Sequence, residues 1–297
     1  MSESLSEWLG LREAADWASR SEMLFNRLRD ALAPLETVHG LDLCTGTGSN
    51  LRYLMDRLPK RQRWLVVDRD ARLLEEIPAR LATWAGARGC SMHTDGRRSR
   101  VRCDRVDYEI ETQQMDLDRL DPVLFEGRHL VTASALLDLV SESWLRALAA
   151  RCHAVGAAAL FTITYNGGSS CDPREPEDDM VRELMNLHQK TDKGLGGSAA
   201  GPDAAVLAER IFEEAGFQVE RAPSDWSLGP SEREFQRMLI EGWAHAATEI
   251  SPGHADAIAD WRRRRLDHVA AGRSRVIVNH DDLVAVQRTS AEEPGEM

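Results

Sequence analysis

The chain has 297 residues, of which 42% are hydrophobic and 29% are charged, and its formal net charge is −12. This balance is typical of a globular protein and excludes a disordered or fibrous chain, and the length fits one large domain or two small ones. The acidic charge disfavours nucleic acid as a partner, because an acidic surface and phosphates repel each other. We therefore expect no nucleic-acid ligand.

The cysteines are odd in number and widely spread, and none forms a CxxC pair; they are Cys44, Cys90, Cys103, Cys152 and Cys171. This pattern predicts neither a metal site nor a disulfide framework, and a reducing cytoplasm is the expected location. No apolar run approaches the roughly 18 residues of a membrane span. The first residues lack the basic start and apolar block of a signal peptide, so we expect no membrane partner and no leader.

Two stretches are rich in arginine, residues 97–105 and residues 262–265. Runs of charge are usually solvated faces, and we expect both to be exposed.

The first 35 residues predict a helical cap. Apolar residues from Trp8 to Ala18 recur at helical spacing, and a second pattern runs over residues 24–32. Ser21 is the expected N-cap of that second helix, and Pro34 ends it.

Short apolar strands then alternate with amphipathic helices. Strands are expected at residues 38–43, 64–68, 106–115, 129–133 and 157–165, with helices beginning near Ser49 or Asn50 and near Leu73. Such alternation predicts βαβ units and a mostly parallel sheet.

Residues 166–201 interrupt this alternation. We expect a loop at residues 166–170, a helix near residues 179–188 and a Gly- and Ala-rich stretch after it. An insertion of this length is often a binding loop or a lid. Alternation resumes over residues 202–288 with helices at 204–215, 232–250 and 254–269 and strands at 217–221 and 274–279, with residues 283–287 as a candidate continuation of the last strand. No linker is visible, so a single domain is expected.

The first strand ends in a glycine turn, which reads Asp42-Leu43-Cys44-Thr45-Gly46-Thr47-Gly48 and continues through Asn50. Glycines let the backbone turn sharply, and the helix that follows offers free N–H groups. Asp68 ends the next strand, where a carboxylate accepts hydrogen bonds from ribose hydroxyls. The order of strand, turn, helix, strand and acid predicts a site for a nucleoside-bearing cofactor.

The third glycine of a dinucleotide fingerprint is missing, because Leu51 stands there. With its acid and its small-residue G-x-G turn, the segment resembles the first motif of the class I S-adenosylmethionine (SAM)-dependent methyltransferases. The family often has glycine at the position of Cys44, and we expect that thiol to line the turn rather than to act as a nucleophile. The resemblance covers residues 38–165 and weakens afterwards.

The resemblance implies a three-layer, Rossmann-like α/β fold with a seven-stranded, mostly parallel sheet whose last strand is antiparallel. In such a sheet, residues 121–125 would be a surface connection. The resemblance also implies S-adenosyl-L-methionine as cofactor, with S-adenosyl-L-homocysteine as product. Residues that match the family's motifs and would contact this cofactor are Asp42, Cys44, Thr45, Gly46, Thr47, Gly48, Asn50, Asp68, Arg69, Asp116, Leu117, Ala133 and Ser134. Asp68 matches the ribose acid and Asp116 the acid at the adenine amine.

Three residues are candidates for catalytic groups that act on the methyl acceptor. His188 is the best candidate for a base or an orienting group, although a lone histidine is more often structural. Tyr165 ends the fifth strand nearby, and Asp138 interrupts an apolar run, where it meets either a ligand or helix N–H groups. Arg12 and Arg20 fit either a clamp for an anion or a solvated face with an Arg12–Asp16 pair.

The leading hypothesis is therefore methyl transfer to a small molecule, with O-, N- and C-methylation all open. The alternatives are a non-catalytic sensor or scaffold with the same fold and, less favoured, an NAD(P)-dependent oxidoreductase. Trp226, Trp243 and Trp261 fit either a core or a homo-oligomer interface.

Overall fold

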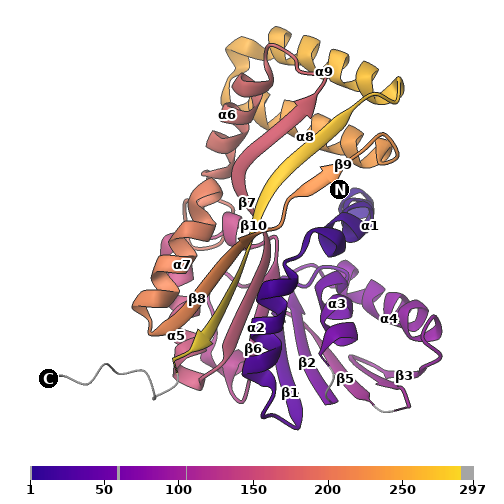
Figure 1. Cartoon of the computed structure of the whole chain (residues 1–297), viewed down its shortest axis with the longest axis vertical. Helices are drawn as coiled ribbons and strands as arrows, with labels where there is room; N and C mark the ends of the chain where they lie inside the picture. The colour runs from indigo at the N-terminus through magenta and orange to yellow at the C-terminus, as the bar shows by residue number, and fades with distance from the viewer. Residues whose placement is uncertain (1, 59–60, 105, 289–297) are drawn as a thin grey trace, which may run out of the picture.

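The computed structural model describes residues 2–58, 61–104 and 106–288. One mixed sheet runs through the molecule, and helices flank it (Figure 1). Its strands are β1 (Thr37–Leu43), β2 (Arg61–Asp68), β3 (Ser91–Asp95), β4 (Arg98–Arg102), β5 (Asp107–Gln114), β6 (Leu130–Ser134), β7 (Ala158–Asp172), β8 (Phe217–Pro223), β9 (Trp226–Leu228) and β10 (Arg275–Gln287).

The described helices follow the predicted pattern closely. They are α1 (Ser2–Ser19), α2 (Glu22–Leu32), α3 (Ser49–Arg57), α4 (Ala71–Gly86), α5 (Glu142–Val155), α6 (Asp178–Gln189), α7 (Ala204–Glu214), α8 (Arg233–Ile250) and α9 (Ala255–Ala270), with short 3₁₀ turns η1 (Pro122–Phe125), η2 (Leu137–Leu139), η3 (Gly201–Asp203) and η4 (Pro252–His254). Ser21 caps α2 as predicted, since its side chain accepts a hydrogen bond from the Leu24 N–H.

Seven strands form the core of the sheet in the order β5-β2-β1-β6-β7-β10-β8. The first five strands of this order run parallel to one another, and β10 is antiparallel to both β7 and β8. This arrangement confirms the class I SAM-dependent methyltransferase fold that the sequence resembles, with its antiparallel last strand. The structure adds a β3–β4 hairpin at one edge and pairs β9 with β10.

The two longest strands, β7 and β10, extend beyond the parallel part of the sheet into a second lobe with β9, α6, α8 and α9 (Figure 1). The predicted loop at residues 166–170 is wrong, because these residues continue β7. They remain extended since β10 supplies backbone partners: Ser169 pairs with Val278 and Ser170 with Ile277. Gly168 lets the Asn279 side chain approach β7 closely, since a Cβ there would lie 2.3 Å from the Asn279 Oδ1 atom and would force that side chain to move.

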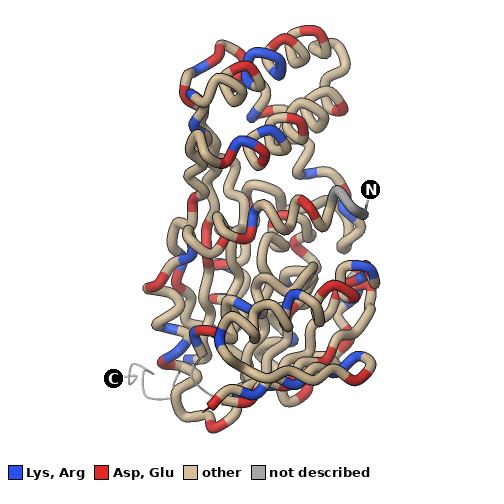
Figure 2. Tube along the Cα trace, turned by 90° about the vertical axis from the view of Figure 1, so that its right-hand side faces the viewer, with Lys and Arg blue, Asp and Glu red and all other residues tan. Residues whose placement is uncertain are grey.

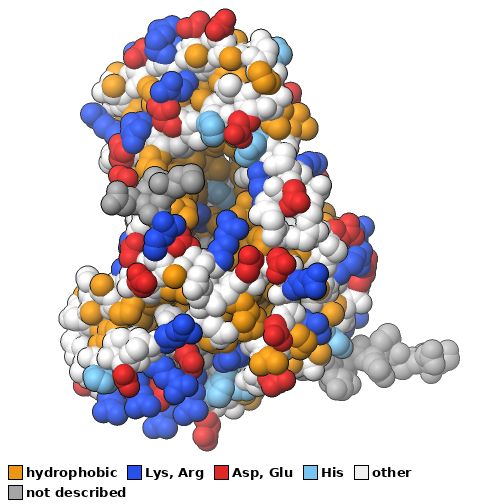
Figure 3. Space-filling view, turned by 180° about the vertical axis from the view of Figure 1, so that it is seen from behind, with side chains coloured by type: hydrophobic (Ala, Val, Ile, Leu, Met, Phe, Trp, Pro, Cys, Tyr) orange, Lys and Arg blue, Asp and Glu red, His pale blue; other side chains and the backbone are white. Residues whose placement is uncertain are grey.

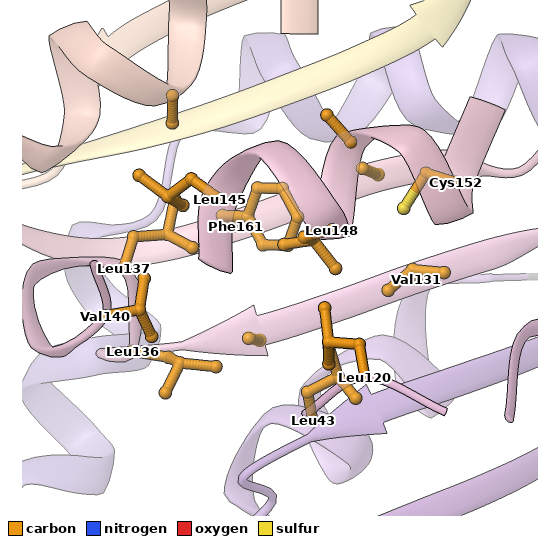
Figure 4. Packing of buried hydrophobic residues seen from close by; sticks show 14 of the residues in the cluster. Leu43, Leu120, Val131, Leu136, Leu137, Val140, Leu145, Leu148, Cys152 and Phe161 are labelled. Atoms are coloured by element: carbon orange, nitrogen blue, oxygen red, sulfur yellow. The ribbon is translucent and has the colours of Figure 1, made fainter. Parts of the chain in front are cut away.

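Three hydrophobic clusters hold these layers together. One joins α5 and α7 to one face of the sheet (Figure 4), another joins α2, α3 and α4 to the opposite face, and the last fills the second lobe. Leu124 and Phe125 belong to the first cluster and are almost fully buried. The prediction of a surface connection at residues 121–125 is therefore wrong at these two positions, because η1 turns their side chains toward the core.

The structure contradicts the expectation that no disulfide forms, because Cys90 and Cys103 are bonded. The antiparallel β3–β4 hairpin explains this pairing. Ser91 lies opposite Arg102, which brings the two cysteines just outside that pair to a Cα–Cα distance of 4.6 Å. The other three cysteines are free thiols.

Basic and acidic residues are interspersed along most of the chain, in both lobes (Figure 2). Arg98 and Arg100 are exposed and face glutamates of β5, as a solvated face predicts, while Arg105 lies outside the described residues. The same prediction is wrong for Arg265, which is 0% exposed because its guanidinium binds the Asp178 carboxylate inside the second lobe.

Candidate active site

The glycine turn lies between the end of β1 and the start of α3, as predicted. Cys44, Gly46 and Gly48 all have positive φ values, of 51°, 56° and 77°. Glycine adopts this conformation without steric cost. The Thr45 N–H donates to the carbonyl of Val67 on β2, which fixes the turn against the sheet.

Asp42 is buried beneath this turn. Its carboxylate accepts hydrogen bonds from Thr45 Oγ1 at 2.5 Å and Asn50 Nδ2 at 2.7 Å. Burial raises the pKa of Asp42 to about 6, and these two hydrogen bonds and the charge of Arg20 oppose the rise. Asp42 and Asn50 thus hold the turn in shape.

Asp68, at the end of β2, accepts backbone hydrogen bonds from Gly46 at 2.8 Å and from Asp70 at 2.9 Å. A carboxylate has about four acceptor positions, so two backbone donors leave room for ligand hydroxyls. Asp116 lies beyond the end of β5 and accepts from the Asp118 N–H. Both acids line one cavity.

This first cavity has a volume of about 450 Å³ and lies against the turn. Most residues predicted to contact the cofactor line it: Asp42, Cys44, Thr45, Gly46, Thr47, Asn50, Asp68, Arg69, Asp116, Leu117 and Ser134. Two predicted residues are not among its lining residues. Gly48 is the N-cap residue of α3, and Ala133 is a residue of β6 that is buried in the first hydrophobic cluster.

Helix α1 forms a wall of the first cavity that the sequence did not predict in full. Leu5, Leu9, Arg12 and Asp16 line it, and Lys193 and Leu195 line it as well. The Arg12–Asp16 pair predicted from their i,i+4 spacing is present at 2.9 Å. The solvated face predicted with it is wrong, because both side chains are buried.

Arg20 does not line the cavity and is not placed as a clamp. Its guanidinium donates to Asn50 Oδ1 at 2.7 Å and to Ser134 Oγ at 3.4 Å, and it stacks over the Tyr53 ring. Arg20 therefore ties the junction of α1 and α2 to the residues behind the turn.

A second cavity of about 470 Å³ adjoins the first, and the two share Arg12, Ala135 and Leu139 as lining residues. It lies at the junction of the lobes, where the surface is hollowed and lined with hydrophobic side chains (Figure 3). All three residues predicted to act on the acceptor line it: Asp138, Tyr165 and His188. The structure thus brings them together, although 50 residues separate the first from the last.

Asp138 is 6% exposed, and its Oδ1 atom has no hydrogen-bond partner among the described residues. Burial raises the pKa of Asp138 to about 6, against the backbone N–H groups of Asp138 and Tyr165 and the charges of Arg12 and Lys193, which lower it. Helix α5 is capped by Ser141, so Asp138 does not serve as its N-cap. The carboxylate faces a cavity instead of a helix end.

Tyr165 and His188 are both held by protein groups. The Tyr165 hydroxyl donates to Asn186 Oδ1 at 2.8 Å, and burial raises its pKa above the ordinary value. The His188 Nε2 atom lies 2.9 Å from Glu249 Oε2, and its Nδ1 atom lies 3.5 Å from Lys193 Nζ. Both side chains contribute to the wall of the cavity with their polar atoms already engaged.

His280 is a lining residue that the sequence did not single out. It lies on β10 with its ring 4.4 Å from that of Trp226 and 6.1 Å from that of Tyr165. Burial and the charge of Arg12 lower its pKa to about 3, so the imidazole is neutral. A histidine on an alternating strand gives no local signal, since only the fold places it in a cavity.

Within the described ranges, no group of three or more His, Cys, Asp or Glu side chains is arranged to hold a metal ion. None of the described helices is long and apolar enough to cross a membrane.

No family model matches the chain, and no curated protein matches it in sequence. Many solved structures are similar to it. The cyclopropane synthase MmaA2 from Mycobacterium tuberculosis is 11% identical with a TM-score of 0.43, and the match covers 89% of this chain and 84% of that one. A SAM-dependent methyltransferase from Thiobacillus denitrificans, in complex with S-adenosyl-L-homocysteine, is 13% identical with a TM-score of 0.41, covering 94% and 98%.

An O-methyltransferase family protein from Burkholderia thailandensis is 15% identical with a TM-score of 0.41, covering 91% of this chain and 57% of that one. The strand order and the glycine turn, rather than these distant similarities, define the class: the chain has the fold of the class I SAM-dependent methyltransferases.

Proposed function

We propose that this protein is a SAM-dependent methyltransferase that acts on a small molecule. The observation that carries the proposal is the pair of adjoining cavities, one against the glycine turn and one between the lobes. Methyl transfer requires the acceptor atom to approach to about 3–3.5 Å in line with the bond that breaks. The two cavities have three lining residues in common, so a ligand in one would lie next to a ligand in the other.

The residues of the first cavity fit the cofactor. Asp68 retains acceptor capacity for ribose hydroxyls, and Asp116, which lines the cavity with Met115 and Leu117, would accept a hydrogen bond from the adenine amine. The methionine part would lie toward Ser134 and Arg12. When bound, the cofactor supplies an activated methyl group, and the protein's task is to orient both reactants and exclude water.

The volume of the second cavity supports a small-molecule acceptor, because pockets for such ligands are usually 300–1,000 Å³. The net charge of −12 also disfavours a nucleic-acid acceptor.

Calorimetry with S-adenosyl-L-homocysteine tests the cofactor. We expect binding, and at a ligand concentration about 100 times Kd the free energy of unfolding rises by about 2.7 kcal/mol. NAD(P) should give no heat, because Leu51 is fully buried at the position where a dinucleotide site needs glycine. Heat with NAD(P) and none with S-adenosyl-L-homocysteine would overturn the proposal.

The Asp68→Ala substitution tests whether the first cavity is the cofactor site. Hydrogen bonds to a charged group contribute about 1.5–3 kcal/mol, so we expect S-adenosyl-L-homocysteine to bind at least ten-fold more weakly. Asp256→Ala, at an exposed position of α9, is the matched control and should bind as the wild type does.

Cofactor binding without methyl transfer to any of a panel of small molecules would favour the sensor alternative.

A further inference from the structure

In the second cavity, two polar atoms have no partner at good hydrogen-bond geometry among the described residues, Asp138 Oδ1 and His280 Nδ1. The backbone N–H groups of Asp138 and Tyr165 act on the Asp138 carboxylate, and the backbone of Val278 acts on the His280 ring, but neither contact fills these two positions. Both side chains are deeply buried, at 6% and 4% exposure, and both line this cavity. A buried polar atom without a partner costs about 1–3 kcal/mol. Two such atoms in one cavity indicate a ligand that brings two hydrogen-bonding groups.

The remainder of the wall is largely aromatic and apolar. Trp8, Trp226, Trp243 and Tyr165 line it together with aliphatic and thioether side chains. Aromatic rings stack well on flat apolar bodies and supply large contact areas. Such a wall favours a ligand with a planar, hydrophobic skeleton.

The charges around Asp138 indicate which kind of reacting group on the ligand the cavity favours. Arg12 lines both cavities; its Nε atom binds Asp16, and no hydrogen bond engages its terminal nitrogens among the described residues. Lys193 lines the first cavity and, like Arg12, acts on Asp138 through its charge. His280 is neutral and adds none. Asp16 pairs with Arg12 and Glu249 acts on Lys193, so both cations are partly balanced. The positive charge that remains beside Asp138 favours an acceptor that becomes negative as it reacts over an ammonium group.

We propose that the methyl acceptor is a planar, hydrophobic phenol or enol whose hydroxyl donates to Asp138 and whose second polar substituent binds His280. The inference rests on the proposed function and names its substrate class. The Asp138 carboxylate accepts the hydroxyl proton, the oxygen forms a bond to the methyl carbon, and the electron pair of the broken C–S bond stays on sulfur. The products are the methyl ether, a neutral thioether and the protonated carboxyl, which releases its proton to water.

Binding of three naphthalenes tests this class by calorimetry, in the presence of S-adenosyl-L-homocysteine. The probes are 2-naphthol, 2-methoxynaphthalene, which lacks the donor, and 2-naphthylmethylamine, which is a cation. We expect 2-naphthol to bind at least ten-fold more tightly than either of the others. In Asp138→Ala this preference over 2-methoxynaphthalene should fall below three-fold, while S-adenosyl-L-homocysteine binds as before.

The Asp138→Asn variant separates binding from proton transfer. Its amide oxygen still accepts the hydroxyl proton in a hydrogen bond but cannot take it up, so 2-naphthol should bind within three-fold of wild type. Methylation of 2-naphthol should fall at least 100-fold, as for loss of a general base. Asp256→Asn, outside both cavities, is the matched control and should change neither quantity.

Tighter binding of the amine, or an unchanged preference for 2-naphthol in Asp138→Ala, would overturn the assignment of a hydroxyl. If none of the naphthalenes binds while S-adenosyl-L-homocysteine does, the substrate class is wrong and the proposed function stands. Failure of S-adenosyl-L-homocysteine to bind would overturn the proposed function instead.

Discussion

Asp42 lines the first cavity and Asp138 the second, and the fold keeps both carboxyls in surroundings of low dielectric constant. Burial raises both pKa values to about 6, but the two groups differ in their partners. Asp42 accepts hydrogen bonds from Thr45 and Asn50, whereas Asp138 has one oxygen atom with no partner among the described residues. The first therefore serves the shape of the turn, and the second is available to a ligand.

The raised pKa of Asp138 predicts a pH dependence of stability. The folded protein retains this proton between pH 4 and 6, where the unfolded chain has lost it, so stability falls as pH rises through that window. A shift of about two units corresponds to about 2–3 kcal/mol. We expect Asp138→Asn to lose less free energy of unfolding than the wild type between pH 4.5 and 7.5, as measured by denaturant titration.

The Asp256→Asn protein serves as the control for this comparison, since its carboxyl is exposed in the folded state. Equal losses in the wild type and in Asp138→Asn over the same pH range would show that Asp138 titrates normally.

Helix α1 lies across the cavities and is tied to the sheet domain by its polar side chains. Glu13 binds Arg52 of α3 at 2.7 Å, and the Trp17 indole donates to Ser49 Oγ at 3.0 Å. Its remaining inward residues, Leu5, Leu9 and Arg12, line the first cavity. A ligand there therefore contacts the helix directly.

We expect S-adenosyl-L-homocysteine to slow hydrogen exchange of the α1 amides, because local opening of the helix would expose the bound ligand. The measurement is exchange followed by mass spectrometry with and without the ligand. Amides of α9, which contributes to neither cavity, provide the internal reference. Equal protection of both helices would contradict a role for α1 as a wall of the site.

The β3–β4 hairpin carries the one disulfide found among the described residues, between Cys90 and Cys103. A cross-link that closes a loop of about 15 residues stabilises by about 3 kcal/mol in the chain-entropy account. We expect the Cys90→Ser, Cys103→Ser double variant to unfold at lower denaturant concentration than the oxidised wild type, by about 2–3 kcal/mol. Reducing agent should lower the wild type to the same level and leave the variant unchanged.

At the scale of the molecule, β7 and β10 pass through both lobes, so the lobes share their longest strands. The second lobe also depends on a buried ion pair, since Asp178 accepts hydrogen bonds from Arg265 and from the Trp261 indole. Because the second lobe is continuous with the sheet and contains this ion pair, we expect the two lobes to unfold together in one cooperative transition.

Removal of one partner of a buried ion pair typically costs about 3–5 kcal/mol, because the other charge is left uncompensated. We expect Arg265→Ala to lower stability by this amount and to shift tryptophan fluorescence and far-UV circular dichroism together. Arg263→Ala, an exposed neighbour on α9, should have little effect. Two separate transitions would show that the lobes unfold independently and that the chain is not a single domain.

Local pattern was sufficient to predict most elements and the glycine turn. The helix periodicities, the Ser21 cap and the alternation of strands depend on neighbouring residues, and these predictions are confirmed. Contacts between distant segments were not predictable in this way. The strand at residues 166–170 exists because β10 pairs with it, and the Cys90–Cys103 bond exists because a hairpin aligns its ends.

By itself, the sequence determined the class of fold and the position of the turn, because both follow from short-range spacing of apolar, glycine and acidic residues. Only the tertiary structure decided which side chains form the second cavity. Arg12, Asp138 and His280 come from three distant parts of the chain, and their surroundings are set by the packing of α1, η2 and β10. Burial, which raises the pKa of Asp138 and lowers that of His280, is a property of that packing and not of either residue type.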